Sequence, residues 1–167
     1  MNRQTLKALG VLFIAAVLFS CSIKPTPQQA VTYSNKIVDI QAQAITSVDD
    51  IISVFGGTAH ELQDAHKAAV EKADKALDGI KQLGPLEAEN TAFYDAAIKY
   101  LTMHKQVLEL EYKEIVNILG KEEVGDEDFS IVEKLMKEAE NKYAKGDEEF
   151  QEAQIKFSKE YGFQIAS

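Results

Sequence analysis

The sequence predicts an all-α fold, an antiparallel up-down-up-down four-helix bundle. Three observations lead to this prediction. Apolar residues recur at helical spacing from residue 31 to the end of the chain. Of the three prolines only Pro85 lies beyond residue 30, and it falls at a break in that pattern, as it should because proline interrupts helix interiors. No segment alternates apolar and polar residues over the length of a strand.

Residues 1–20 have the pattern of a lipoprotein signal peptide. Arg3 and Lys7 provide a basic start, and no charge follows over residues 8–19. That stretch would form a helix of about 18 Å, too short for a hydrocarbon core of roughly 30 Å, so it indicates secretion. It ends in Leu-Phe-Ser directly before Cys21, the only cysteine, which resembles the bacterial lipobox. We expect Cys21 to be the lipidated first residue of the mature protein; the alternative is an ordinary cleaved signal beside an incidental cysteine.

Residues 21–30 are predicted to be the lipidated cysteine and an extended tether, because they contain two prolines and no apolar period. Residues 31–167 then form one helical-bundle domain. Acyl chains on the cysteine would hold the protein in a membrane without a transmembrane helix. Ser22 follows the cysteine, where an aspartate would favour retention in the inner membrane. The predicted location is therefore the bacterial cell envelope, lipid-anchored in the outer membrane.

The charge balance excludes one class of partner. The chain has 18 basic and 27 acidic residues, and removing Arg3 and Lys7 with the signal peptide leaves 16 against 27, a net charge of −11. Arg3 is the only arginine, so the mature domain has no guanidinium group. Because nucleic-acid binders depend on Lys and Arg contacts to phosphate, we expect no nucleic-acid partner. The single cysteine also excludes an intrachain disulfide and a thiolate zinc site.

The first two helices have clear boundaries. The first is predicted over residues 32–55 and ends at two glycines. Thr58 and Glu61 then have the spacing of a capping box, in which each side chain covers the other's backbone amide. The second helix therefore begins here and runs to Leu83, where Gly84 and a proline end it.

The third helix is predicted to begin between Pro85 and Asn90 and to end at Leu119. Gly120 follows as the C′ residue, a position that is commonly left-handed. The apolar face of this helix includes Phe93, Ala97, Tyr100, Leu101, His104, Val107, Leu108, Ile115, Ile118 and Leu119.

The fourth helix is predicted from about residue 127 to Tyr161, with a weak point at Gly146. Its apolar stripe includes Val132, Met136, Ala139, Tyr143, Phe150, Ala153 and Phe157. Because short connections force neighbouring helices to pack antiparallel, the four segments favour the up-down-up-down order. A long helical hairpin that dimerises is the alternative architecture.

Known catalytic motifs do not match. A di-iron bundle needs Glu-x-x-His on two helices, but glycine, glutamine and leucine stand three residues before the three histidines. Residues 126–128 resemble the start of a calcium loop, yet Ile131 and Lys137 occupy the positions that require glycine and glutamate. No phosphate-binding glycine loop or Gly-x-Ser-x-Gly elbow occurs. We expect the protein to be non-enzymatic, with no cofactor.

His66 and His104 form the one pattern that could carry chemistry. Both fall on predicted core stripes of adjacent helices, each about 19 residues from a turn near residue 85, with Tyr143 near the same level. Facing imidazoles could bind haem iron or a transition metal. The favoured interpretation is that each hydrogen-bonds a polar neighbour in the core, where a polar layer can fix the register of the helices.

Two segments resemble a known family. Residues 111–120 (EYKEIVNILG) and 153–163 (AQIKFSKEYGF), behind a lipobox, are similar to a family of uncharacterised bacterial surface lipoproteins that are short, secreted and predicted to be helical. The similarity covers most of the mature chain. It implies a location and a fold, and it brings no activity and no site residues.

The leading functional hypothesis is a membrane-tethered surface lipoprotein that binds a protein partner, as yet unknown, or serves as an envelope component. It predicts an exposed apolar or aromatic patch on one helix pair. The alternative, a haem- or metal-binding bundle, predicts that His66 and His104 meet in the interior. An enzyme with scattered catalytic residues would instead show a sizeable cleft with perturbed titratable groups.

Overall fold

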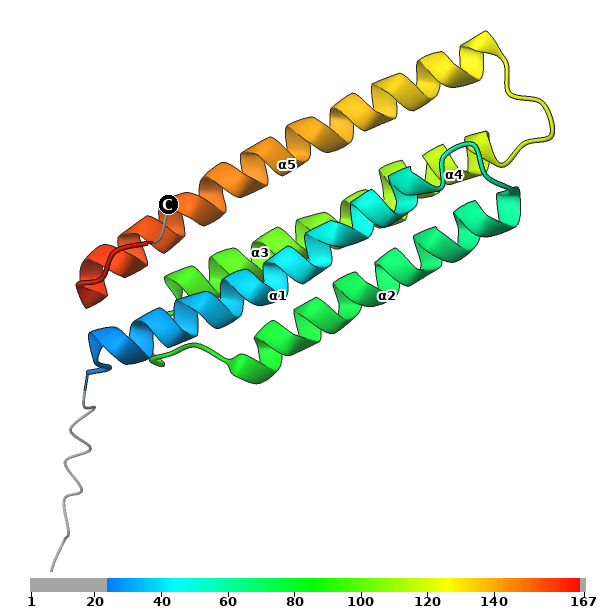
Figure 1. The fold of residues 1–167 in the computed structure, drawn as a ribbon. Coiled ribbons are helices and arrows are strands. Elements are labelled where there is room, and N and C mark those ends of the chain that lie inside the picture. The colour runs from blue at the N-terminus through cyan, green and yellow to red at the C-terminus, as the bar shows by residue number, and fades with distance from the viewer. Residues whose placement is uncertain (1–23, 166–167) are drawn as a thin grey trace, which may run out of the picture.

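The computed structural model describes residues 24–165 and confirms an all-helical bundle (Figure 1). The predicted signal peptide 1–20 and Cys21 lie outside these residues. The elements are α1 (Pro27–Ser53), α2 (Ala59–Leu83), α3 (Ala92–Val107), the π-helical turn η1 (Leu108–Tyr112), α4 (Lys113–Leu119) and α5 (Asp126–Tyr161). None of these helices has the combination of length and apolarity that crossing a membrane requires.

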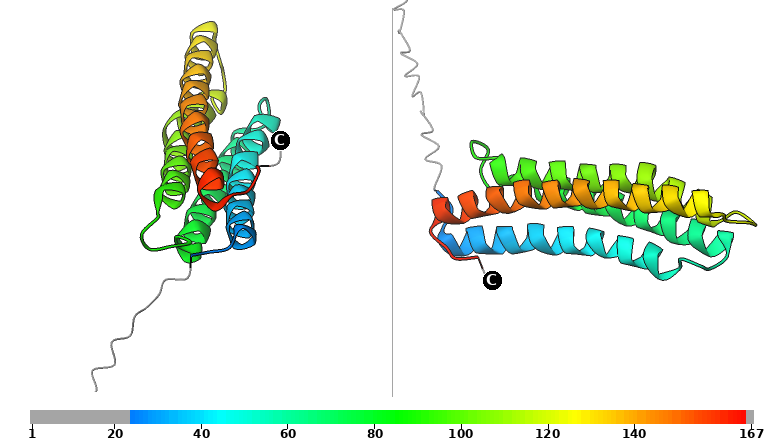
Figure 2. Two further views of the ribbon diagram at one scale, coloured as in Figure 1. Left: turned by 90° about the vertical axis from the view of Figure 1, so that its left-hand side faces the viewer. Right: turned by 90° about the horizontal axis from the view of Figure 1, so that it is seen from above.

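The helices of the bundle do not all contact one another to the same extent. The segment α3–η1–α4 is one continuous rod that contacts α2 on one side and α5 on another, while α1 packs chiefly on α2 (Figures 1 and 2). The α5 helix contacts α3 closely and α1 only slightly. As a result, α3 and α5 form a pair whose outer side carries no further helix of this chain within residues 24–165.

The first helix starts earlier than residue 32, the predicted start. Thr26 caps it: the Thr26 hydroxyl accepts a hydrogen bond from the amide of Gln29 at 3.3 Å, and the Gln29 side chain accepts one from the Thr26 amide at 2.8 Å. Pro27 occupies the first helical position, where a missing amide proton costs nothing. Residues 27–30, predicted as tether, are therefore helical, because this proline starts a helix instead of preventing one.

The predicted boundaries of α2 are confirmed. Glu61 accepts a hydrogen bond from the Thr58 amide at 2.7 Å, which completes the capping box. Gly84 ends the helix with a φ of 64°, a positive value that glycine adopts at little cost because it has no Cβ.

Two glycine predictions were wrong. Gly120, predicted as the C′ residue, is instead the C-cap residue of α4, with a φ of −83°. A Cβ there would lie 3.3 Å from Cβ of Ala59, so the glycine instead lets the end of α4 approach the start of α2. Gly146 is no weak point, since α5 runs through it without a break. A Cβ at this position would collide with the methyl group of Met103 on α3, so the glycine serves close packing between the two helices.

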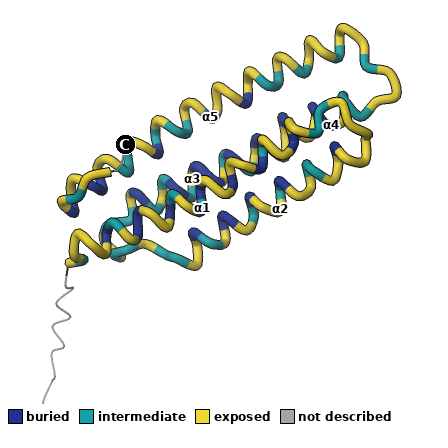
Figure 3. Tube along the Cα trace, in the orientation of Figure 1, coloured by how far each residue is buried: buried dark blue, intermediate teal, exposed yellow. Residues whose placement is uncertain are grey.

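The core has two parts. An aromatic cluster near the start of α1 includes Phe93, Phe150 and Phe157, with 5.0 Å between the ring centroids of Phe93 and Phe157. A second cluster of mainly aliphatic residues lies toward the other end, around Ile51, Leu62, Val107, Leu108 and Ile115. Before Phe150 the only buried residue of α5 is Ala139, so the first half of this helix is mostly exposed (Figure 3).

The predicted third helix starts at Ala92, slightly later than expected, and contains a π-helical turn that its periodicity did not predict. In this turn the amide of Lys113 donates to the carbonyl of Leu108, five residues earlier. The wider turn shifts the side chains that follow relative to an unbroken α-helix. Glu111, which lies within this turn, is buried although its side chain is ionisable.

Candidate functional site

His104 lies in a polar layer at the centre of the bundle. Its side chain is completely buried, with Nδ1 3.0 Å from the hydroxyl of Tyr143 on α5 and Nε2 3.3 Å from Oγ of Ser47 on α1. Burial lowers the pKa of the imidazole from 6.5 to about 4, so His104 is neutral at pH 7. The layer therefore joins three helices through uncharged groups.

The hydrogen bonds define the tautomer of His104. The Ser47 hydroxyl donates to the carbonyl of Ala44 at 2.6 Å, so its oxygen can only accept from the imidazole. Nε2 therefore carries the proton and donates to Ser47, while Nδ1 accepts from the hydroxyl of Tyr143. Both ring nitrogens are thus occupied by protein groups.

His66 has a different environment. It is half-buried on α2, and Nε2 donates to the carbonyl of Leu108 at 2.8 Å, at the start of the π-helical turn. Leu108 lies one helical turn beyond His104, and the two imidazoles share no hydrogen-bond partner. Within residues 24–165 no three His, Cys, Asp or Glu side chains are grouped as a metal site would require. These contacts fit the favoured interpretation for His104, a core histidine that hydrogen-bonds polar neighbours. The prediction for His66 was wrong: it lies at the edge of the core, half-buried, because it bonds the backbone of the π-helical turn one helical turn beyond His104.

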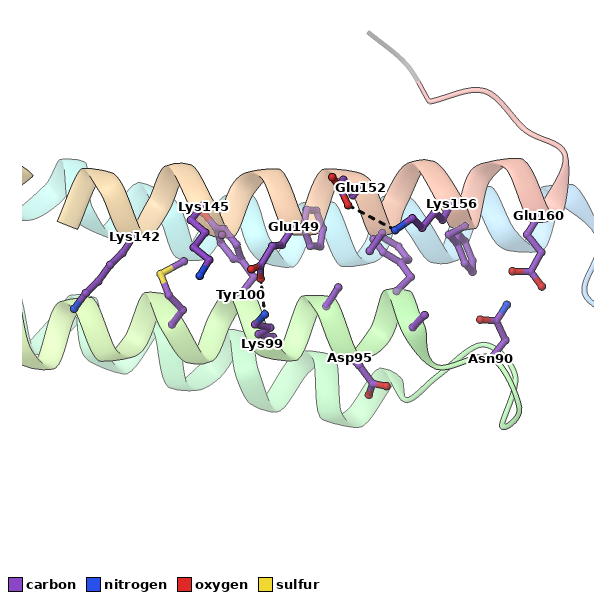
Figure 4. A pocket seen from close by; sticks show the side chains of 18 residues that line it. Asn90, Asp95, Lys99, Tyr100, Lys142, Lys145, Glu149, Glu152, Lys156 and Glu160 are labelled. Atoms are coloured by element: carbon purple, nitrogen blue, oxygen red, sulfur yellow. Dashed lines mark hydrogen bonds and ion pairs between the residues drawn. The ribbon is translucent and has the colours of Figure 1, made fainter. Parts of the chain in front are cut away.

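A groove of about 580 Å³ runs between α3 and α5 on the outer side of this helix pair (Figure 4). Its volume is in the range of small-molecule and cofactor sites. The floor is apolar and consists of Ala92, Phe93, Ala96, Tyr100, Met103, Gly146, Phe150, Ala153 and Phe157. The large rings lie beneath and are buried, whereas the small residues leave the groove open to solvent.

Charged side chains of both signs form the rim of the groove. They are Asp95, Lys99, Lys142, Lys145, Glu149, Glu152, Lys156 and Glu160. Lys99 on α3 pairs with Glu149 on α5 at 2.5 Å, so this ion pair spans the groove (Figure 4). The bond from Lys99 holds the pKa of Glu149 below its usual range.

One end of the groove is closed by a second ion pair. Lys142 reaches from α5 to Glu111 on the π-helical turn, with 2.6 Å between Nζ and Oε1. The side chain of Glu111 is only 8% exposed, and its Oε2 has no hydrogen-bond partner among the residues that the structure describes. The π-helical turn thus places the carboxylate that anchors Lys142.

The groove was missed at the level of sequence, although a signal for it exists. Along α5, Gly146, Phe150, Ala153 and Phe157 repeat at intervals of three and four residues, and charged residues flank them on the exposed side. This is the pattern of a seam between helices. Two small residues in that seam predict a depression in the helix surface.

No protein-family model matches the chain, and neither a curated protein nor a solved structure is significantly similar to it.

Proposed function

We propose that this chain is a lipid-anchored protein of the bacterial cell envelope that acts without catalysis, by binding a protein partner through the groove between α3 and α5. The groove is the observation that carries the proposal. It is an exposed, largely apolar surface on one helix pair, which is what a binding role requires. The resemblance to surface lipoproteins is part of the same proposal.

The two connections α1–α2 and α4–α5 lie at one end of the bundle in Figure 1, and the α2–α3 connection lies at the other. This arrangement supports the up-down-up-down order. Lys24 lies over the ring of Tyr161, 5.5 Å from its centroid, near the end of α5. Cys21 is three residues away, at most about 10 Å of extended chain. An outer-membrane anchor at Cys21 would therefore hold this end of the bundle near the lipid.

The lipid anchor is tested with a clickable palmitate analogue in bacteria that express the full chain. We expect label on the wild-type protein, recovered in outer-membrane fractions, and none on a Cys21→Ser variant. Equal labelling of both proteins, or an unlabelled wild type, would show that the cysteine is not lipidated.

The groove is tested with a photoreactive amino acid at Ala96, which lies on its floor. The matched control carries the same group at Ala42, on the α1–α2 side of the bundle. We expect a defined cross-linked product from position 96 and none from position 42. Identical products from both positions, or none from position 96, would argue against the groove as the binding surface.

A further inference from the structure

The groove-facing side of α5 has the organisation of one half of a helix–helix contact. Two small residues, Gly146 and Ala153, lie half-exposed between charged residues that recur every three or four positions from Lys142 to Glu160. This stretch is about 27 Å long, or five helical turns. A seam flanked by charges of both signs is how paired helices select their partners. The occupant that fits it is another helix.

The charges of the rim restrict the occupant further. Four lysines and four carboxylates line the groove, so a contacting face that carries charges of one sign would meet as much repulsion as attraction, whereas a face of mixed charge can match it. Most of these charges are already engaged within the chain. Within residues 24–165, Lys145, Glu160 and Asp95 form no ion pair. Of these three, Asp95 accepts a hydrogen bond from the hydroxyl of Thr91.

The two residues of α5 without an ion pair, Lys145 and Glu160, carry opposite charges and could pair between two copies of the chain. They lie 15 positions apart, and a twofold axis level with residues 152 and 153 would bring Lys145 of one copy opposite Glu160 of a second copy. The same axis brings Glu149 opposite Lys156, so these two would exchange their pairs with Lys99 and Glu152 within each copy for a pair between copies. Symmetry repeats both pairs along one antiparallel α5–α5 contact, and the two between Lys145 and Glu160 form without breaking an ion pair of the single copy.

We propose that a second copy of this chain occupies the groove, with α5 of each copy lying antiparallel in the α3–α5 groove of the other. The inference rests on the proposed role of the groove as a binding surface. Ala153 lies beside the axis, where a small side chain lets the helices approach closely. A parallel pairing is disfavoured because it would place each charge beside its own copy, Lys145 against Lys145 and Glu160 against Glu160.

The orientation is tested by cysteine cross-linking of the full chain in its native membrane. Ala153→Cys lies next to the axis, so mild oxidation should join two copies of this variant through the new thiol. Glu148→Cys is the matched control, because residue 148 is exposed on α5 but does not line the groove. We expect a disulfide-linked dimer from the first variant only. The wild-type chain reports whether Cys21 itself is reactive.

The charge match is tested by reversal. Lys145→Glu and Glu160→Lys should each weaken dimerisation about tenfold or more, because each turns two attractive contacts into repulsive ones. The double variant should recover most of the lost affinity. Both residues are exposed, so neither change threatens folding. Lys159→Glu, beside the groove but outside its lining, should leave dimerisation unchanged.

Three outcomes would overturn the dimer. One is a double variant as weak as the single variants, and another is equal cross-linking at positions 153 and 148. The third is an Ala153→Cys adduct with a different protein, which would retain the groove as a binding surface but replace its occupant. Failure of the lipid anchor is separable, because it appears as an unlabelled, reactive Cys21 in the same cells.

Discussion

Acid should destabilise this protein through His104. Its imidazole is fully buried, and its pKa falls from 6.5 to about 4 on folding. Between these two values the unfolded chain binds a proton that the folded chain does not bind. The free energy of unfolding therefore rises with pH across this window, and the contribution of the neutral imidazole is lost as the pH falls from 6.5 toward 4.

The size of the effect follows from the same interval. A span from 6.5 to about 4, at about 1.4 kcal/mol per pH unit, corresponds to about 3 kcal/mol. Because single domains are stable by only about 5–15 kcal/mol, such a loss would be easily measured. Most of it should be visible above pH 5, before most carboxylates titrate.

The assay is urea denaturation of the bundle, followed by circular dichroism at several pH values from 7 to 4.5. His104→Leu should flatten the dependence above pH 5, and His104→Gln should flatten it while retaining hydrogen-bonding groups. His60→Gln is the matched control, since the side chain of His60 is 84% exposed, and should behave as the wild type. If wild type and both His104 variants lose stability equally between pH 6.5 and 5, the reasoning is wrong.

Three further predictions concern stability and use the same urea assay at pH 7. Gly79→Ala should stabilise the protein by up to about 1 kcal/mol, because alanine favours the helix more than glycine does. The new Cβ would lie 3.5 Å from the side chain of Ile40, an ordinary contact. A loss of stability would show that the α1–α2 contact tolerates no added methyl group. Tyr143→Phe should cost about 1–3 kcal/mol by leaving the buried imidazole nitrogen without its donor, and a cost near zero would contradict the hydrogen bond at 3.0 Å. Lys142→Met should cost about 1–3 kcal/mol, because the buried Glu111 carboxylate would lose its counterion. Adding Glu111→Leu to this variant should recover part of the lost stability. An equal or larger loss in the double variant would argue against the ion pair.

The helix boundaries that could be predicted are those set by local interactions. Thr58 and Glu61 hydrogen-bond each other across one turn, and Gly84 alone can adopt its positive φ without strain. The start of α1 depends on an equally local pair, Thr26 and Gln29, and was missed because Pro27 suggested an extended tether. Such errors concern residues a few positions apart and need no tertiary information to correct.

The candidate site was predictable only in part. The periodicity of the third helix placed His104 on the core stripe and indicated Tyr143 as a neighbour, and the structure brings these two side chains into hydrogen-bonding distance. The π-helical turn was not predictable, because its Leu108 carbonyl and Glu111 carboxylate bind His66 and Lys142 from other helices. Its pattern of apolar residues resembles that of an ordinary α-helix.

The helical class, the ends of most helices and the apolar stripe of each could be predicted without tertiary information, since they depend on backbone propensities, caps and a 3.6-residue period. The tertiary structure decided which stripes are covered. The α5 helix packs on α3 and leaves a groove over Gly146 and Ala153, because Gly146 lets Met103 lie against the α5 backbone and no other described helix covers that side. A surface formed by residues about 50 positions apart depends on how two helices meet, and neither helix encodes that alone.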